Sequence, residues 1–76
     1  MFILYQRDDC HLCDLALAVL AQARVRVLES VFIDADPDLE ARYGARVPVL
    51  RDSASRRELD WPFDAATLAG WLRLGT

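Results

Sequence analysis

Two cysteines separated by two residues stand where an apolar strand pattern gives way to a helical one. Cys10 and Cys13 are the only cysteines of the 76-residue chain, and a short polar loop separates them from the apolar run Phe2–Tyr5. Such a run is typical of a strand buried on both faces. From Leu12 onward the apolar residues recur at helical spacing. The sequence therefore predicts a strand, a tight turn and a helix, with two sulfurs at the helix start.

The first helix is expected over about residues 11–23, with Asp9 or Cys10 as its N-cap. Its predicted buried stripe comprises Leu12, Ala16, Val19, Leu20 and Ala23, and Leu15 and Leu17 widen the apolar surface. A second strand is expected over approximately residues 27–33. A strand, a helix and a strand in this order close as a parallel pair with a right-handed crossover.

The second half of the chain predicts a short helix and then a hairpin. The helix begins at Asp36–Pro37, an N-cap followed by the residue that suits the first helical position, and Gly44 ends it. Residues 47–50 form a third strand with Pro48 at its start, where a missing N–H is tolerated. Residues 56–60 form a polar edge strand, close enough to the third to pair with it as an antiparallel hairpin.

The last helix is expected over residues 65–74, with Asp64 as its N-cap and Leu68, Trp71, Leu72 and Ala65 on its apolar stripe. The element order is therefore β-α-β-α-β-β-α. It predicts an α/β domain that spans residues 1–76, with a four-stranded mixed sheet and helices on both faces.

Composition excludes several classes of function. The net charge is −3 and 54% of the residues are hydrophobic, which suits a small packed domain and gives no general affinity for nucleic acid or acidic membranes. No apolar run approaches the ~20 residues of a membrane span, and the start lacks the basic and apolar segments of a signal peptide. We therefore expect a soluble, cytoplasmic monomer, in which a Cys-x-x-Cys pair is more often catalytic or metal-binding than structural.

The positions of the two sulfurs predict different roles for them. On the first turn of a helix, positions i and i+3 share a face, with Cβ atoms roughly 5–6 Å apart. Cys10 lies at the helix end, where free N–H groups and the macrodipole favour a thiolate. Cys13 lies one turn inward. We therefore expect Cys10 to attack a target disulfide and Cys13 to resolve the mixed disulfide.

Charged neighbours act on the predicted thiolate in both directions. Arg7 favours it, and His11 does so when protonated or as a hydrogen-bond donor. Asp8, Asp9 and Asp14 oppose it by like charge. The sequence does not rank these effects, so it leaves the reduction potential open.

Other uses of the cysteines stay open at this stage. They can be small buried residues, or metal ligands together with His11, although zinc usually takes four ligands. A cluster shared between two chains, or a domain that binds a partner without turnover, is a further alternative. Covalent haem attachment is excluded, because Asp14 and not histidine follows Cys13.

The chain resembles a glutaredoxin, within the thioredoxin-fold superfamily. The stretch Leu4–Cys13 is similar to the glutaredoxin start, in which a tyrosine, a basic residue and Cys-Pro-Tyr-Cys follow the first strand, and Arg7 matches the basic residue. Val47–Pro48 matches the Thr-Val-Pro signature, with Arg46 in place of the threonine, and Asp64 matches an aspartate that helps to hold glutathione. The resemblance is closest to small bacterial glutaredoxin-like proteins with a Trp-Pro-Phe-Asp segment before the last helix.

This resemblance implies a thiol–disulfide oxidoreductase with no bound cofactor and with glutathione as co-substrate. It implies a cis bond at Pro48, which with the Val47 backbone forms a shelf for an extended thiol substrate; Arg7, His11 and Asp64 complete the expected substrate contacts. Its implied partners are a thiol or disulfide protein, or glutathione. Two departures stand out: His-Leu replaces Pro-Tyr between the cysteines, and Trp61–Pro62 stands where glutaredoxins carry Gly-Gly to let backbone approach the tripeptide.

Overall fold

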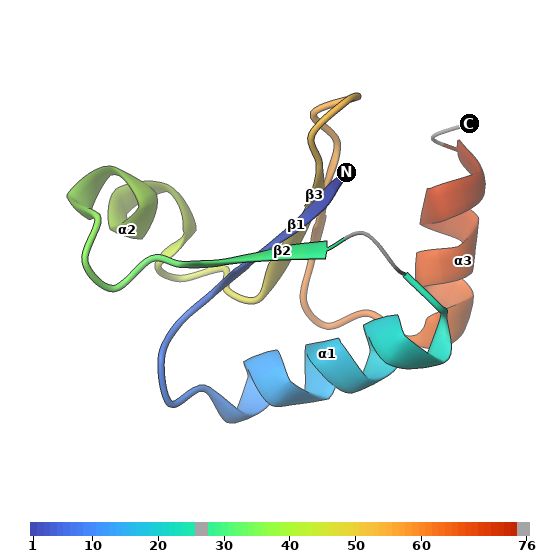
Figure 1. Ribbon diagram of the computed structural model, residues 1–76, viewed down its shortest axis with the longest axis horizontal. Helices are drawn as coiled ribbons and strands as arrows, with labels where there is room; N and C mark the ends of the chain where they lie inside the picture. The colour runs from blue at the N-terminus through green and yellow to red at the C-terminus, as the bar shows by residue number, and fades with distance from the viewer. Residues whose placement is uncertain (26–27, 75–76) are drawn as a thin grey trace.

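The computed structural model describes residues 1–25 and 28–74 (Figure 1). In this part of the chain the elements follow the predicted order. They are β1 (Phe2–Gln6), α1 (His11–Gln22), β2 (Leu28–Phe32), α2 (Pro37–Tyr43), β3 (Val49–Asp52), β4 (Glu58–Asp60) and α3 (Ala65–Leu74).

The four strands form one mixed sheet in the order β2-β1-β3-β4. β1 pairs in parallel with β2 and antiparallel with β3, and β3 pairs antiparallel with β4. This confirms the parallel pair, the hairpin and the edge position of the last strand. Val27, which the sequence placed in the second strand, lies outside the described residues.

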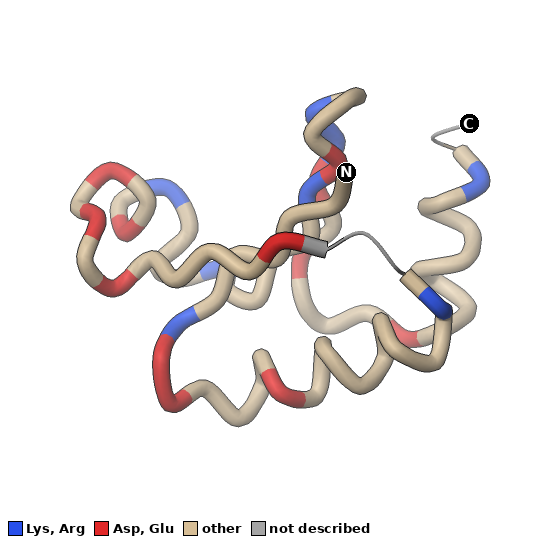
Figure 2. Tube along the Cα trace, in the orientation of Figure 1, with Lys and Arg blue, Asp and Glu red and all other residues tan. Residues whose placement is uncertain are grey.

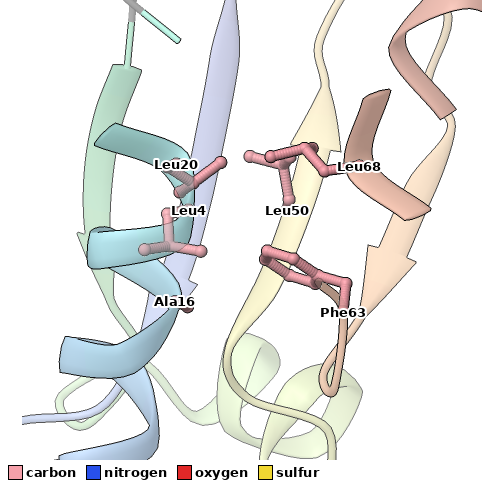
Figure 3. Packing of buried hydrophobic residues seen from close by; sticks show 6 residues of the cluster. All are labelled: Leu4, Ala16, Leu20, Leu50, Phe63 and Leu68. Carbon is pink, nitrogen blue, oxygen red and sulfur yellow. The ribbon is translucent and has the colours of Figure 1, made fainter. Parts of the chain in front are cut away.

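One face of the sheet carries the main hydrophobic core. Leu4 of β1 lies opposite Leu50 of β3, and both side chains are fully buried. They pack with residues of α1, of α3 and of the segment before α3 (Figure 3), namely Ala16, Leu20, Phe63 and Leu68. This packing fixes α1, and therefore the cysteines at its start, against the centre of the sheet.

The opposite face packs against α2. The next register pair, Tyr5 and Val49, belongs to a second cluster that includes Ile33 and the fully buried Tyr43 of α2. The rings of Tyr5 and Tyr43 stack with centroids 4.2 Å apart. Because side chains alternate along a strand, neighbouring register pairs serve opposite faces. The predicted cover of helices on both faces is confirmed (Figure 1).

All three predicted helix starts are confirmed by their caps. Cys10, one of the two residues expected to cap α1, is its N-cap. Asp36 accepts hydrogen bonds from the backbone N–H groups of Asp38 and Leu39, at 3.0 and 3.2 Å. Asp64 accepts one from the Thr67 N–H at 2.7 Å. These local signals fix where α1 and α3 begin, and thus where the candidate site residues lie.

Two predictions about buried positions were wrong. Leu12 is 47% exposed, because Cys13, Ala16 and Leu20 form the buried line of α1 and Leu12 lies about 100° around the helix from Cys13. Ala65 is exposed as well, since it stands at the first turn of α3, ahead of the buried Leu68. The first of these errors matters for function, because it leaves an apolar side chain in solvent between the two cysteines.

Candidate active site

The two cysteines form a disulfide at the N-terminus of α1. The Cα atoms of Cys10 and Cys13 lie 5.2 Å apart, within the usual range for a disulfide. Cys10 is partly exposed, whereas only 1% of Cys13 is accessible. An incoming sulfur can therefore reach Cys10 and not Cys13, as the predicted division of roles requires.

The backbone around Cys10 favours a negative sulfur there. Its side chain accepts a hydrogen bond from the Cys13 backbone N–H, with an N–Sγ distance of 3.1 Å. Cys10 itself has extended backbone torsions, which is typical of an N-cap, and its carbonyl oxygen accepts the N–H of Asp14. When the disulfide is reduced, a donated N–H and the positive end of the helix dipole both stabilise the thiolate over the thiol.

The residues between and around the cysteines are open to solvent. His11 and Leu12 are exposed, so His11 lies beside the sulfurs but is not buried with them. Asp8, Asp9 and Asp14 are exposed too, which weakens their opposition to a thiolate by solvent screening. Of the predicted site residues, Cys10, His11 and Cys13 therefore lie together on one helix turn.

Arg7 is bound by Glu40 of α2 and by the Gly44 carbonyl oxygen just after that helix. Its guanidinium forms a bidentate ion pair with the Glu40 carboxylate, in which the Nη1–Oε2 distance is 2.9 Å. It also donates a hydrogen bond to the Gly44 carbonyl oxygen at 3.0 Å. Asp34 lies 3.7 Å from the same guanidinium. A side chain at position 44 would collide with this pair, since a Cβ there would lie 2.7 Å from the Glu40 Oε1 atom. The guanidinium is therefore engaged within the chain, and its expected contact with a thiolate or glutathione stays a prediction.

Val47 and Pro48 lie at the same end of the sheet as the cysteines. The peptide bond between them is cis, as the resemblance implied. Pro48 directly precedes Val49, whose partner Tyr5 stands near the end of β1 that leads into the cysteine loop. The Val47 N–H donates to the Tyr43 carbonyl oxygen at 3.0 Å, so this donor of the expected shelf is already engaged within the chain.

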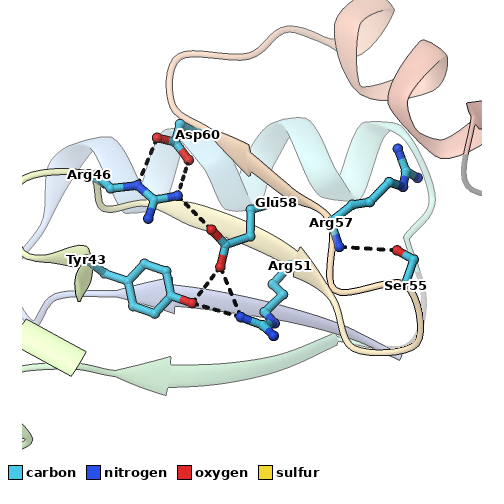
Figure 4. A network of polar contacts seen from close by, with 7 residues as sticks. All are labelled: Tyr43, Arg46, Arg51, Ser55, Arg57, Glu58 and Asp60. Atoms are coloured by element: carbon cyan, nitrogen blue, oxygen red, sulfur yellow. Dashed lines mark hydrogen bonds and ion pairs between the residues drawn. The ribbon is translucent and has the colours of Figure 1, made fainter. Parts of the chain in front are cut away.

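A network of ion pairs braces this loop from the hairpin (Figure 4). Arg46, the residue before Val47, donates to both carboxylate oxygens of Asp60 at 3.0 and 2.8 Å and to Glu58 at 2.8 Å. Glu58 also accepts from Tyr43 at 2.6 Å and from Arg51 at 3.1 Å. Tyr43 belongs to α2, so the network joins α2, the loop and two strands. It therefore fixes the position of the segment that would receive a substrate.

The pKa of Glu58 reflects this network. Desolvation raises it, but hydrogen bonds from Tyr43 and Arg46 and the charges of Arg46 and Arg51 outweigh that effect and lower the pKa below its ordinary value. Hydrogen bonds from Arg46 likewise lower the pKa of Asp60. Both carboxylates therefore stay ionised at neutral pH and accept the hydrogen bonds of the network in that form.

Asp64 lies at the start of α3, in the segment that follows the hairpin. The Trp61 N–H donates to the Pro48 carbonyl oxygen at 3.2 Å, which joins this segment to the cis-proline loop. The Trp61–Pro62 bond is also cis, a feature that the sequence did not predict. The Asp64 side chain caps α3, and its hydrogen bond from the Thr67 N–H lowers the pKa of the carboxyl group.

Sequence reasoning also missed two side-chain interactions of this site. Glu40, the partner of Arg7, lies 33 residues from it, and no local pattern indicates that they meet. The role of Arg46 as a brace was missed as well, because its partners Glu58 and Asp60 lie 12 and 14 residues along the chain. Within the described ranges, no cluster of three or more histidine, cysteine or acidic side chains is arranged to hold a metal ion. No helix there has both the length and the apolar character needed to cross a membrane.

A mixed four-stranded sheet with helices on both faces, and a Cys-x-x-Cys disulfide where the first strand enters the first helix, define a thioredoxin-like domain. The family model of the Glutaredoxin-like domain (DUF836) matches residues 1–73, so the chain belongs to this family. This confirms the resemblance in the sequence.

Solved structures of a bacterial protein agree with this assignment. The X-ray structure of the structural genomics target XcR50 from X. campestris is 62% identical, covers 97% of each chain and superposes with a TM-score of 0.93. A solution structure of XcR50 is 63% identical, covers 96% of this chain and 92% of its own, and gives a TM-score of 0.88. No curated protein matches the chain. The comparisons thus support the fold and the family.

Proposed function

We propose that the protein is a thiol–disulfide oxidoreductase of the glutaredoxin-like type. The observation that carries the proposal is the asymmetry of its disulfide. Cys10 is accessible at the positive end of α1 and accepts an N–H from Cys13, whose own sulfur is buried. An accessible sulfur stabilised as a thiolate and a shielded sulfur one turn away form a nucleophile and its resolving partner.

The chemistry balances without a bound cofactor. In the reduced protein, the Cys10 thiolate attacks one sulfur of a target disulfide, and the other target sulfur leaves as a thiolate and takes up a proton. Cys13 then loses its proton and displaces the second target sulfur from Cys10, which closes the Cys10–Cys13 disulfide. The target gains the two electrons that the protein loses, and the opposite direction oxidises a target dithiol.

The segment at Val47 and Pro48 is proposed as the surface on which the target chain lies. Its support is its place at the same end of the sheet and its bracing by Arg46, which would keep it fixed during exchange. Because the Val47 N–H is engaged with Tyr43 and the Pro48 side chain is fully buried, the proposed contact uses the Val47 carbonyl oxygen. We further propose that the protein works as a monomer in the cytoplasm, where Cys-x-x-Cys pairs are usually catalytic or metal-binding.

A paired reduction assay tests the proposed activity. Two electron donors suit it: glutathione, the co-substrate that the resemblance implies, and a thioredoxin reductase. We expect the protein to accelerate reduction of a mixed disulfide with one of them. If neither donor supports turnover although the Cys10–Cys13 disulfide can be reduced chemically, the protein is a non-catalytic binding module and the proposal is wrong.

A further inference from the structure

Negative charge surrounds the disulfide. Asp8 and Asp9 precede Cys10, Asp14 follows Cys13, and all three side chains are exposed; we call these three residues the acidic rim. Asp34 extends it, because its Oδ2 atom accepts the Asp8 N–H at 2.8 Å. In Figure 2 the loop before α1 shows a blue segment followed directly by a red one, and a further red segment lies on the first turns of α1.

The basic residue nearest the cysteines does not offset the rim. Arg7 is bound by Glu40 and Gly44 and lies 3.7 Å from Asp34, so its charge is neutralised within the chain. An anionic ligand that approaches Cys10 therefore meets like charge. Glutathione is such a ligand, because it carries two carboxylates and one ammonium group at neutral pH.

Two exposed leucines lie on the first turns of the helix that carries the same sulfur. Leu12 and Leu15 are 47% and 42% exposed, and their spacing places them on one face of α1. They flank the buried line of Cys13, Ala16 and Leu20, with Leu12 about 40° and Leu15 about 100° around the helix from Ala16. The accessible sulfur thus lies on a loop and helix start that carry exposed acidic and apolar side chains, which is complementary to an apolar segment flanked by basic residues.

We propose that the partner of this disulfide is a polypeptide that presents its cysteine among apolar and basic side chains, and that glutathione is a poor substrate. The proposal rests on the exchange chemistry proposed above. The step is the one already described: the Cys10 sulfur bonds to the partner's cysteine sulfur as the partner's S–S bond breaks, and Cys13 completes the transfer of two electrons. The rim selects which partner arrives, by electrostatic steering and by stabilising the mixed disulfide.

The test compares exchange rates of the reduced protein with four disulfides. Two are synthetic peptides with the same apolar residues and one cysteine capped by 2-mercaptoethanol, flanked by arginine in one and by glutamate in the other. The third is oxidised glutathione, and the neutral 2-hydroxyethyl disulfide is the reference. At low salt we expect the arginine peptide to react about tenfold faster than the glutamate peptide or glutathione, and the ratio to fall below about threefold in 0.5 M salt.

A charge variant with a matched control makes the test specific. Asp9 has a φ of 52°, a region that asparagine tolerates well, so the double variant Asp9→Asn/Asp14→Asn removes charge with little effect on the backbone. We expect it to lower the arginine-to-glutamate ratio about threefold or more. Glu29→Gln removes one charge on β2, at the end of the sheet far from Cys10, and leaves the ratio unchanged.

The outcomes separate this inference from the proposed function. Equal rates for the two peptides, in a protein that reacts with 2-hydroxyethyl disulfide, overturn the partner assignment and leave the exchange activity intact. No reaction with any of the four disulfides overturns the exchange activity itself. A stable dimer in light scattering that Leu12→Ala/Leu15→Ala dissociates would show that a second copy covers the leucines, which also overturns the assignment.

Discussion

Replacing Cys10 by serine is expected to lower the rate of disulfide exchange by on the order of 1,000-fold or more, because it removes the attacking sulfur. Cys13→Ser keeps that sulfur and removes only the group that releases the product. This variant is therefore expected to react once with a target disulfide and stop as a covalent mixed disulfide at Cys10. Intact-mass spectrometry measures the trapped adduct, and the paired reduction assay measures turnover.

The two serine variants control for each other. Both lose the Cys10–Cys13 disulfide and exchange one sulfur for oxygen, so a loss of the cross-link affects them equally. A difference in adduct formation between the two variants then shows which cysteine attacks and which one resolves. Trapped adduct on Cys10→Ser, with none on Cys13→Ser, would reverse the assignment of nucleophile and resolving cysteine.

Glu58→Gln is expected to destabilise the fold by about 2 kcal/mol, a fall of roughly 10 °C in Tm. The Glu58 carboxylate, with a side chain only 22% exposed, accepts hydrogen bonds from Tyr43, Arg46 and Arg51. A glutamine offers one oxygen in place of two and turns an N–H₂ group toward donors. Urea unfolding at pH 7 measures the loss, and Glu29→Gln, an equal change at an exposed position, is expected to stay within about 0.5 kcal/mol of the parent.

The effect of Glu58→Gln should also depend on pH in a defined direction. The network lowers the pKa of Glu58 in the folded protein, so its stabilisation is complete above the ordinary glutamate value of 4.5. It is lost as the pH falls through the lower, folded-state pKa. The difference in unfolding free energy between parent and variant should therefore shrink below pH 4.5. A difference that grows in acid would contradict the network as the source of the stabilisation.

Local chemistry explains why so much of the fold could be predicted from the sequence. Asp36 and Asp64 cap their helices through hydrogen bonds that span two or three residues, so the sequence alone indicates both starts. The Cys-x-x-Cys pair at a strand-to-helix boundary is equally local. Its sulfurs meet because an N-cap side chain turns back over the first turn, toward the residue three positions on.

The remaining features depend on contacts between distant residues. Arg7 matched a basic position of the family pattern, yet Glu40, which lies 33 residues along the chain, binds its guanidinium. Leu12 stands at helical spacing from other apolar residues, which predicted that it is buried. In the structure the small side chains of Cys13 and Ala16 are buried instead, and Leu12 is exposed. Both differences arise from how α1 and α2 pack on the sheet, which periodicity does not determine.

The central claim is that Cys10 is a solvent-accessible thiolate at neutral pH, and alkylation of the reduced protein tests it most directly. Peptide mapping after brief iodoacetamide treatment across a pH series gives the reactivity of each cysteine separately. We predict that Cys10 is modified first, with a midpoint at least about one unit below the free-thiol value of ~8.5, and that Cys13 is protected. A midpoint at or above ~8.5, or faster modification of Cys13, would contradict the proposed function.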